Sequence, residues 1–114
     1  MKDMKKVEFV IEAVYVKRLI ELFKRHGIHG YTIVKDIEGA GGHGIRTADD
    51  VSDMFSNNYI FTVCEAKQFE KMEIDVRNFL EKYGGKCMLS DVMLLLGEKQ
   101  RREGINLKYS GNIS

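Results

Sequence analysis

Apolar positions in the first part of the chain change from a two-residue period to a helical period. Residues 7–12 alternate apolar and polar side chains, as a half-buried β-strand does. Val16, Leu19, Ile20 and Phe23 then follow at the spacing of an amphipathic helix, which we expect to end at Gly27. A second β-rich stretch covers residues 29–37, so the first third of the chain predicts a β-α-β unit.

The second part of the chain repeats this order. Residues 59–64 form another β-rich run, and residues 69–83 trace a second amphipathic helix that ends at Gly84 and Gly85. A last strand is predicted from about residue 87 to residue 96. The pattern predicts an α+β class and a ferredoxin-like βαββαβ fold, which has an antiparallel sheet with both helices on one face.

Two features of this fold point beyond a single chain. The second and third strands pair directly in it, yet residues 38–58 separate them, and loops of this length in compact domains are usually functional or disordered. The apolar strand residues also exceed what two helices on one face can hide; they are Phe9, Ile11, Ile33, Phe61 and Val63. We therefore expect association through the sheet.

Composition narrows the class of protein. The chain has 114 residues, 44% of them hydrophobic and 31% charged, which suits one small domain over residues 1–97 followed by a polar tail over residues 98–114. Eighteen basic residues against seventeen acidic ones exclude the strong basic field of a nucleic-acid binder. The longest apolar run, residues 92–96, is too short to span a membrane. Cys64 and Cys87 lie in apolar segments, as buried reduced thiols of a cytoplasmic protein do.

A glycine cluster opens the long loop. Residues 39–44, Gly-Ala-Gly-Gly-His-Gly, match the G-x-G-x-x-G pattern after a predicted strand, and Glu65 follows where a dinucleotide fold places its ribose acid. That fold needs a full crossover helix, whereas only residues 47–55 are available here, so we disfavour it. Glycines also let the backbone approach an anion closely and offer it N–H groups. A merely flexible loop is the alternative.

Two further groups suit a nucleotide. Gly84, Gly85 and Lys86 can hold a phosphate through backbone N–H groups and one charge, although a helix end with a solvated lysine is favoured when these residues are taken alone. Thr32 can bond a base or ribose, although a strand threonine needs no such role. His43 with Asp49, Asp50 and Asp53 has no regular metal-ligand spacing, so a solvated loop is favoured over an ion site.

These pieces, in this order, resemble the PII signalling superfamily, and within it the PII-like proteins associated with bicarbonate transport and carboxysomes. The resemblance covers residues 6–97. It implies a homotrimer with an adenine nucleotide (ADP, AMP or ATP) in the clefts between subunits, a T-loop over residues 38–58 that closes on phosphate, a B-loop at Gly85 and Lys86, and a base contact from Thr32. The nucleotide-binding residues that it implies are Thr32, Gly39, Gly41, Gly42, His43, Arg46, Cys64, Glu65, Gly84, Gly85, Lys86, Lys99 and Arg101.

The chain departs from that superfamily in three places. Residues 38–58 contain no tyrosine, so the uridylylation of nitrogen-regulating relatives has no acceptor. The arginine pair that those relatives place after the last strand is out of register here, since Lys99 lies near those positions and Arg101 and Arg102 are displaced. We therefore expect ADP or AMP to bind at least as well as ATP. The cysteine-bearing C-terminal loop of some bicarbonate-transport relatives is absent, so no redox switch is expected.

The sequence thus predicts a cytoplasmic regulator rather than an enzyme, with no cofactor and no metal. It would sense adenine nucleotides and regulate a membrane transporter, for bicarbonate by the resemblance, through the T-loop. Bicarbonate is a candidate second ligand, and the transporter would recruit the protein to the inner face of the membrane. The alternatives are a small ferredoxin-like nucleotide phosphohydrolase, with Asp49, Asp50 or Glu65 as general base, and a metal-responsive trimer of similar fold.

Overall fold

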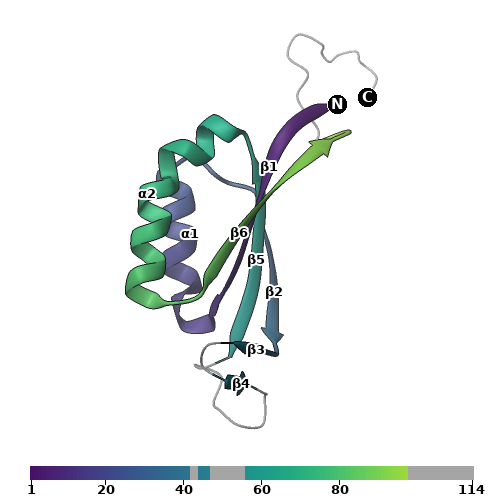
Figure 1. Cartoon of the computed structure of the whole chain (residues 1–114). Helices are drawn as coiled ribbons and strands as arrows, with labels where there is room; N and C mark the ends of the chain where they lie inside the picture. Colours follow the sequence, from purple (N-terminus) through teal and green to yellow (C-terminus); the bar gives the residue numbers. More distant parts are fainter. Residues whose placement is uncertain (42–43, 47–55, 98–114) are drawn as a thin grey trace, which may run out of the picture.

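The computed structural model describes residues 1–41, 44–46 and 56–97. Six strands and two α-helices follow one another along these residues (Figure 1); in chain order the elements are β1 (Lys2–Glu12), a short 3-10 turn (Ala13–Tyr15), α1 (Val16–Arg25), β2 (Thr32–Ile37), β3 (Gly39–Gly41), β4 (Gly44–Arg46), β5 (Asn57–Cys64), α2 (Ala66–Tyr83) and β6 (Lys86–Leu94). Every helix and strand that the hydrophobic pattern predicts is present.

The four long strands form one antiparallel sheet in the order β2-β5-β1-β6. Strand β1 is central, and its Phe9 lies opposite Ile60 of β5 and Cys87 of β6. Strand β2 pairs directly with β5, as predicted for the strands on either side of the long loop. Both helices lie on one face of the sheet (Figure 1), so the ferredoxin-like prediction is confirmed.

Strand β1 begins at Lys2, five residues before the alternating pattern that predicted it. Residues 2–6 pair with residues 90–94 of β6, and in Figure 1 the starting end of β1 and the end of β6 extend past the helices. A strand that has no helix over it needs no buried face, and hydrophobic alternation reports only burial. The pattern therefore missed this part of β1.

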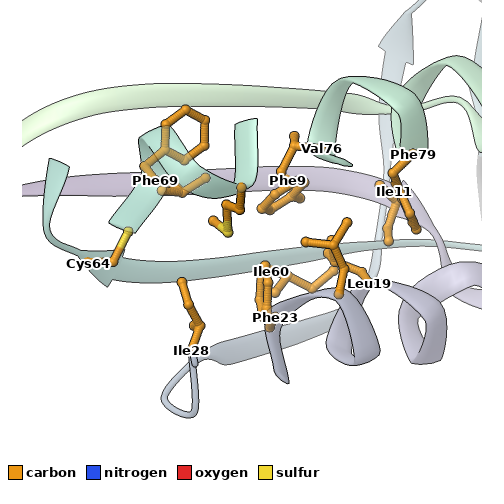
Figure 2. Packing of buried hydrophobic residues seen from close by; sticks show 13 residues of the cluster. Phe9, Ile11, Leu19, Phe23, Ile28, Ile60, Cys64, Phe69, Val76 and Phe79 are labelled. Carbon is orange, nitrogen blue, oxygen red and sulfur yellow. The ribbon is translucent and has the colours of Figure 1, made fainter. Parts of the chain in front are cut away.

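The core lies between the helices and the sheet (Figure 2). The Phe9 and Phe23 side chains are fully buried, and their ring centroids are 5.7 Å apart. The whole buried cluster consists of Val7, Phe9, Ile11, Leu19, Leu22, Phe23, Ile28, Ile60, Cys64, Phe69, Met72, Val76 and Phe79. Burial of this one layer supplies the main stabilising free energy of the fold.

Helix α1 ends where its sequence predicts. Gly27 has a φ of 75°, its N–H donates to the carbonyl of Lys24, and the N–H of Ile28 donates to the carbonyl of Phe23. This pair of bonds is the Schellman arrangement, which needs a left-handed residue and so favours glycine. Within the described part of the chain, no helix is long and apolar enough to cross a membrane.

The two cysteines are free thiols, as predicted. Cys64 is buried in the core and Cys87 on β6 is half-buried. Burial raises the pKa of the Cys64 thiol, and it raises the pKa of Cys87 to about 11. Both groups are therefore protonated and poorly nucleophilic at neutral pH.

The face of the sheet away from the helices is uncovered (Figure 1); we call it the open face. Register places Tyr59 and Phe61 of β5 on it, together with Val34 and Met88, which are 46% and 45% exposed. Of the five apolar residues expected to exceed the cover of two helices, Phe9, Ile11 and Ile33 lie on the covered face, so the expectation was wrong for them, whereas Phe61 and Val63 lie on the open face. The open face therefore holds the surplus, and a large apolar sheet face of this kind is typical of an interface.

The open face also carries two polar contacts beside these rings. The Tyr59 hydroxyl donates to Oε2 of Glu8 over 2.6 Å, and Nζ of Lys6 lies 4.8 Å from the centroid of the Phe61 ring. The hydrogen bond to Glu8, together with burial and the Glu8 charge, raises the pKa of Tyr59 to about 12. A carboxylate that accepts from a phenol holds the proton on the phenol.

Replacement of Tyr59 by Phe should remove a pH-dependent contribution to stability at alkaline pH. Because the folded pKa of about 12 exceeds the ordinary value of 10.0, the hydrogen bond stabilises the fold fully below pH 10 and less as pH rises toward 12. Urea unfolding at a series of alkaline pH values measures this change. The wild type should lose more stability across this interval than Tyr59→Phe, with Tyr31→Phe as the matched control. Equal slopes for wild type and Tyr59→Phe would contradict the assignment.

Candidate functional site

One group of predicted site residues follows the β2 edge of the sheet. Thr32 is the first residue of β2, is exposed, and lies opposite Phe61, which places it on the open face. Gly39 follows the end of β2 by two residues and begins β3. Gly30 precedes β2, and added Cβ atoms at Gly30 and Gly39 would meet no heavy atom within 4 Å. The fold itself therefore does not require glycine at either position.

The glycine cluster forms a hairpin instead of the entry to a helix. Strands β3 and β4 are antiparallel, with Gly39 opposite Arg46 and Gly41 opposite Gly44. Hydrophobic patterning could not predict this pair, since strands of three residues, Gly-Ala-Gly and Gly-Ile-Arg, are too short to show an apolar alternation. The arrangement differs from the dinucleotide fold, in which the glycines open a crossover helix. Strand β3, Gly-Ala-Gly, contributes little side-chain bulk to the pair.

A second group lies at the opposite edge, where α2 meets β6. Gly84 ends α2 with a φ of 83°, and its N–H donates to the carbonyl of Leu80. Gly85 has a φ of 99°, and an added Cβ would lie 2.6 Å from the Val10 carbonyl oxygen. Lys86 follows as the exposed first residue of β6 and forms no ion pair with any carboxylate among the described residues. The backbone conformation at the end of α2 thus explains both glycines, while the charge of Lys86 stays available to a ligand.

Cys64 and Glu65 lie at the end of β5, on the side where β2 begins, since Thr62, two positions before Cys64, bonds to Gly30. The Cys64 side chain is in the core (Figure 2), so its thiol contacts no ligand there. Nζ of Lys2 lies 2.7 Å from Oε2 of Glu65, and this partner lowers the pKa of the Glu65 carboxyl. Both side chains are more than half exposed, so the pair contributes little to stability. Sequence patterns gave no sign of it, because its partners are separated by 63 positions.

Thr32 and Lys86 are therefore far apart within one chain. Two strands, β5 and β1, lie between β2 and β6. Three strand spacings of about 4.8 Å separate the edges by about 14 Å. One lysine cannot bridge that distance to a group held at Thr32, so the two edges of one chain do not converge on a single phosphate.

Four predicted residues lie outside the described residues: Gly42, His43, Lys99 and Arg101. The proposed metal ligands Asp49, Asp50 and Asp53 lie outside them too. Arg46 is placed by its backbone alone, at the end of β4. Over residues 1–41, 44–46 and 56–97, no group of three His, Cys, Asp or Glu side chains is arranged to hold a metal ion.

A groove of about 240 Å³ runs between α1 and α2, on the helical side of the sheet. Arg18, Arg25 and Lys82 line it together with Asp75, whose carboxylate lies 2.7 Å from Nε2 of His26 and 3.9 Å from Arg25. None of the predicted nucleotide-binding residues lies in this groove. The candidate site therefore belongs to the sheet edges and not to the helices.

Comparison with known proteins identifies the family. The family model described as "Nitrogen regulatory protein P-II" matches residues 4–98, most of the chain. The chain belongs to the P-II family. Members of this family are signalling proteins without enzymatic activity, so the phosphohydrolase alternative is wrong. No curated protein matches the chain.

Several solved P-II-like structures share this fold. CPII from Thiomonas intermedia K12, a nitrogen regulatory PII-like protein bound to ADP, AMP and bicarbonate, has 23% identity and a TM-score of 0.72 over 79% of this chain and 86% of that one. A PII-like signalling protein from Thermus thermophilus has 25% identity and a TM-score of 0.66, over 80% of this chain and 88% of its own. Arabidopsis thaliana PII bound to citrate is more distant, with 16% identity and a TM-score of 0.54 over 77% and 76%.

Substitution of Gly85, which follows α2, should destabilise the fold. Gly85→Ala forces a side chain onto a left-handed backbone and against the Val10 carbonyl, at a cost of about 1–3 kcal/mol. Gly30→Ala is the matched control, because its Cβ enters open space at an ordinary φ, and it should change stability by less than about 0.5 kcal/mol. Chemical denaturation measures both. Equal stability of the two variants would show that the turn at Gly85 rearranges freely.

Proposed function

We propose that this protein is a homotrimeric signalling protein that binds adenine nucleotides between its subunits and regulates a membrane transporter. One observation carries the proposal: Thr32 and Lys86 lie on opposite edges of the sheet in each chain. A closed trimer brings the β2 edge of one protomer beside the β6 edge of the next. Base contact and phosphate charge then come from different subunits.

The open face supports the trimer. Val34, Tyr59, Phe61 and Met88 form an apolar surface on the side of the sheet that the helices leave bare. Association through this face removes apolar area from water and shields the Tyr59–Glu8 hydrogen bond. It also leaves the sheet edges at the junctions between protomers, where the candidate residues are.

Two features support an adenine nucleotide as the ligand. The Lys86 ammonium group is exposed and unpaired among the described side chains, as a phosphate-binding lysine must be. Gly30 and Gly39 lack a structural need to be glycine, so close approach of a ligand to the backbone accounts for them. CPII from Thiomonas intermedia, which shares the fold, was solved with ADP and AMP.

Regulation would act through residues 38–58, the T-loop of the proposal. A nucleotide shifts the loop between two states only by binding one of them more tightly. The hairpin of β3 and β4 begins two residues after β2, so a ligand at that edge touches the base of the loop. Bicarbonate, present in the CPII structure beside the nucleotides, is the proposed second ligand and makes inorganic carbon the proposed nutrient. The transporter would hold the protein at the cytoplasmic face of the membrane.

The proposed assembly predicts a mass of about three chains in solution. Multi-angle light scattering of the purified protein at micromolar concentration measures it. Phe61→Glu should reduce the mass toward that of a monomer, because it puts a charge on the open face, whereas Glu70→Lys on the outside of α2 should not. A wild-type monomer would remove the intersubunit site and overturn the proposal.

Lys86→Ala should weaken nucleotide binding without changing the fold. A charged hydrogen bond to phosphate contributes about 1.5–3 kcal/mol, so ADP affinity should fall about tenfold or more. Calorimetry measures it with ADP, AMP and ATP, and Lys71→Ala on the exposed side of α2 is the matched control. ADP or AMP should bind the wild type at least as tightly as ATP. Wild-type affinity of Lys86→Ala for all three nucleotides would make Lys86 a solvated residue only.

A further inference from the structure

Strand β5 carries two polar side chains in the core. Asn58 and Thr62 are only 4% and 2% exposed, and they are the buried polar side chains among the described residues. They alternate with Ile60 and Cys64 on the face of β5 that the helices cover. A polar group there costs free energy unless it forms a hydrogen bond.

Each of these side chains bonds to the backbone at one end of β2. The Thr62 hydroxyl donates to the carbonyl of Gly30 over 2.5 Å, two residues before β2 begins. The Asn58 Oδ1 accepts the N–H of Asp36 over 3.1 Å, one residue before β2 ends. Two positions on the covered face of β5, four residues apart, thus hold the entry and the exit of β2.

Both ends of β2 need such support. Strand β2 is an edge strand with β5 as its only partner in the sheet. Its register shifts between Val34 and Ile37, and Asp36 has a φ of 58°, which is unfavourable for a residue other than glycine. At the other end, Gly30 has open space around its Cα, so side-chain packing does not hold it. The two hydrogen bonds hold the ends of β2, where strand pairing and side-chain packing do not.

We propose that Asn58 and Thr62 are positioning residues of the nucleotide site. Thr62 fixes Gly30 and so sets the place of Thr32, the base contact of the proposed function. Asn58 fixes the bend at Asp36 and so sets the direction in which the chain enters Gly39 and the T-loop. The expected effect of these residues on nucleotide binding rests on the proposed function. Their effect on the position of β2 rests on the two hydrogen bonds alone.

The test uses four variants of the full chain. Thr62→Val removes the hydroxyl at nearly constant shape, and Thr62→Ser restores it. Asn58→Leu removes the amide at similar volume, and Asn57→Leu makes the same change at the neighbouring position on the other face of β5. If Asn58→Leu does not fold, Asn58→Ser, whose side chain is too short to reach Asp36, takes its place.

Amide hydrogen exchange of the ligand-free protein tests the structural part. Thr62→Val should speed exchange around residues 28–32 and leave residues 36–39 as in the wild type, and Asn58→Leu should do the reverse. Thr62→Ser and Asn57→Leu should match the wild type at both ends. Loosening of both ends by either variant, or of neither, would overturn the positioning role, since general destabilisation acts on both.

Calorimetry with ADP, GDP and AMP then tests the consequence for binding. Thr62→Val should lower the preference for ADP over GDP about tenfold and leave the ADP to AMP ratio unchanged. Asn58→Leu should change the ADP to AMP ratio by a similar factor and keep the preference for adenine. Parallel loss of all three affinities would overturn the positioning role. No binding by the wild type would overturn the proposed function instead, and the exchange result would then decide alone whether these side chains hold β2.

Discussion

The buried face of β1 is the constraint on which the rest of this structure depends. Val7, Phe9 and Ile11 are at most 1% exposed, and they lie on the one strand that pairs with both β5 and β6. A slip of one residue in either pairing would bring polar or charged side chains under the helices. The register of three strands, and with it the position of every edge residue, is therefore tied to one apolar stripe.

Because both helices cover the same face, the other face and both edges are left for association. The open face combines apolar side chains with the Tyr59–Glu8 hydrogen bond, which suits contact with another protein surface better than contact with water. A single P-II-like chain thus holds two candidate half-sites, at Thr32 and at Lys86, on edges about 14 Å apart. The proposed trimer joins the half-sites of neighbouring chains, so assembly and ligand binding depend on the same surface.

The glycines of the chain differ in what they indicate. Gly85 is required by the fold, since its φ and the nearby Val10 carbonyl exclude a side chain. Gly30 and Gly39 meet no such limit, and they flank the edge strand whose ends Thr62 and Asn58 hold. A glycine without a structural reason is the stronger pointer to a ligand. By this criterion the β2 edge, more than the turn before β6, is the part of the proposed site at which we expect backbone and ligand to approach closely.

The sequence by itself determined the two helices, the four long strands and their order, because burial imposes a period of two on strands and of 3.6 on helices. It also located the Gly27 helix end and the long loop between β2 and β5. Only the tertiary structure decided that Thr32 and Lys86 lie on opposite edges, that the Cys64 thiol faces the core, and that Asn58 and Thr62 hold β2. Each of these facts depends on strands that are distant in sequence becoming neighbours in the sheet. The period of the apolar residues along the chain does not indicate which strands pair.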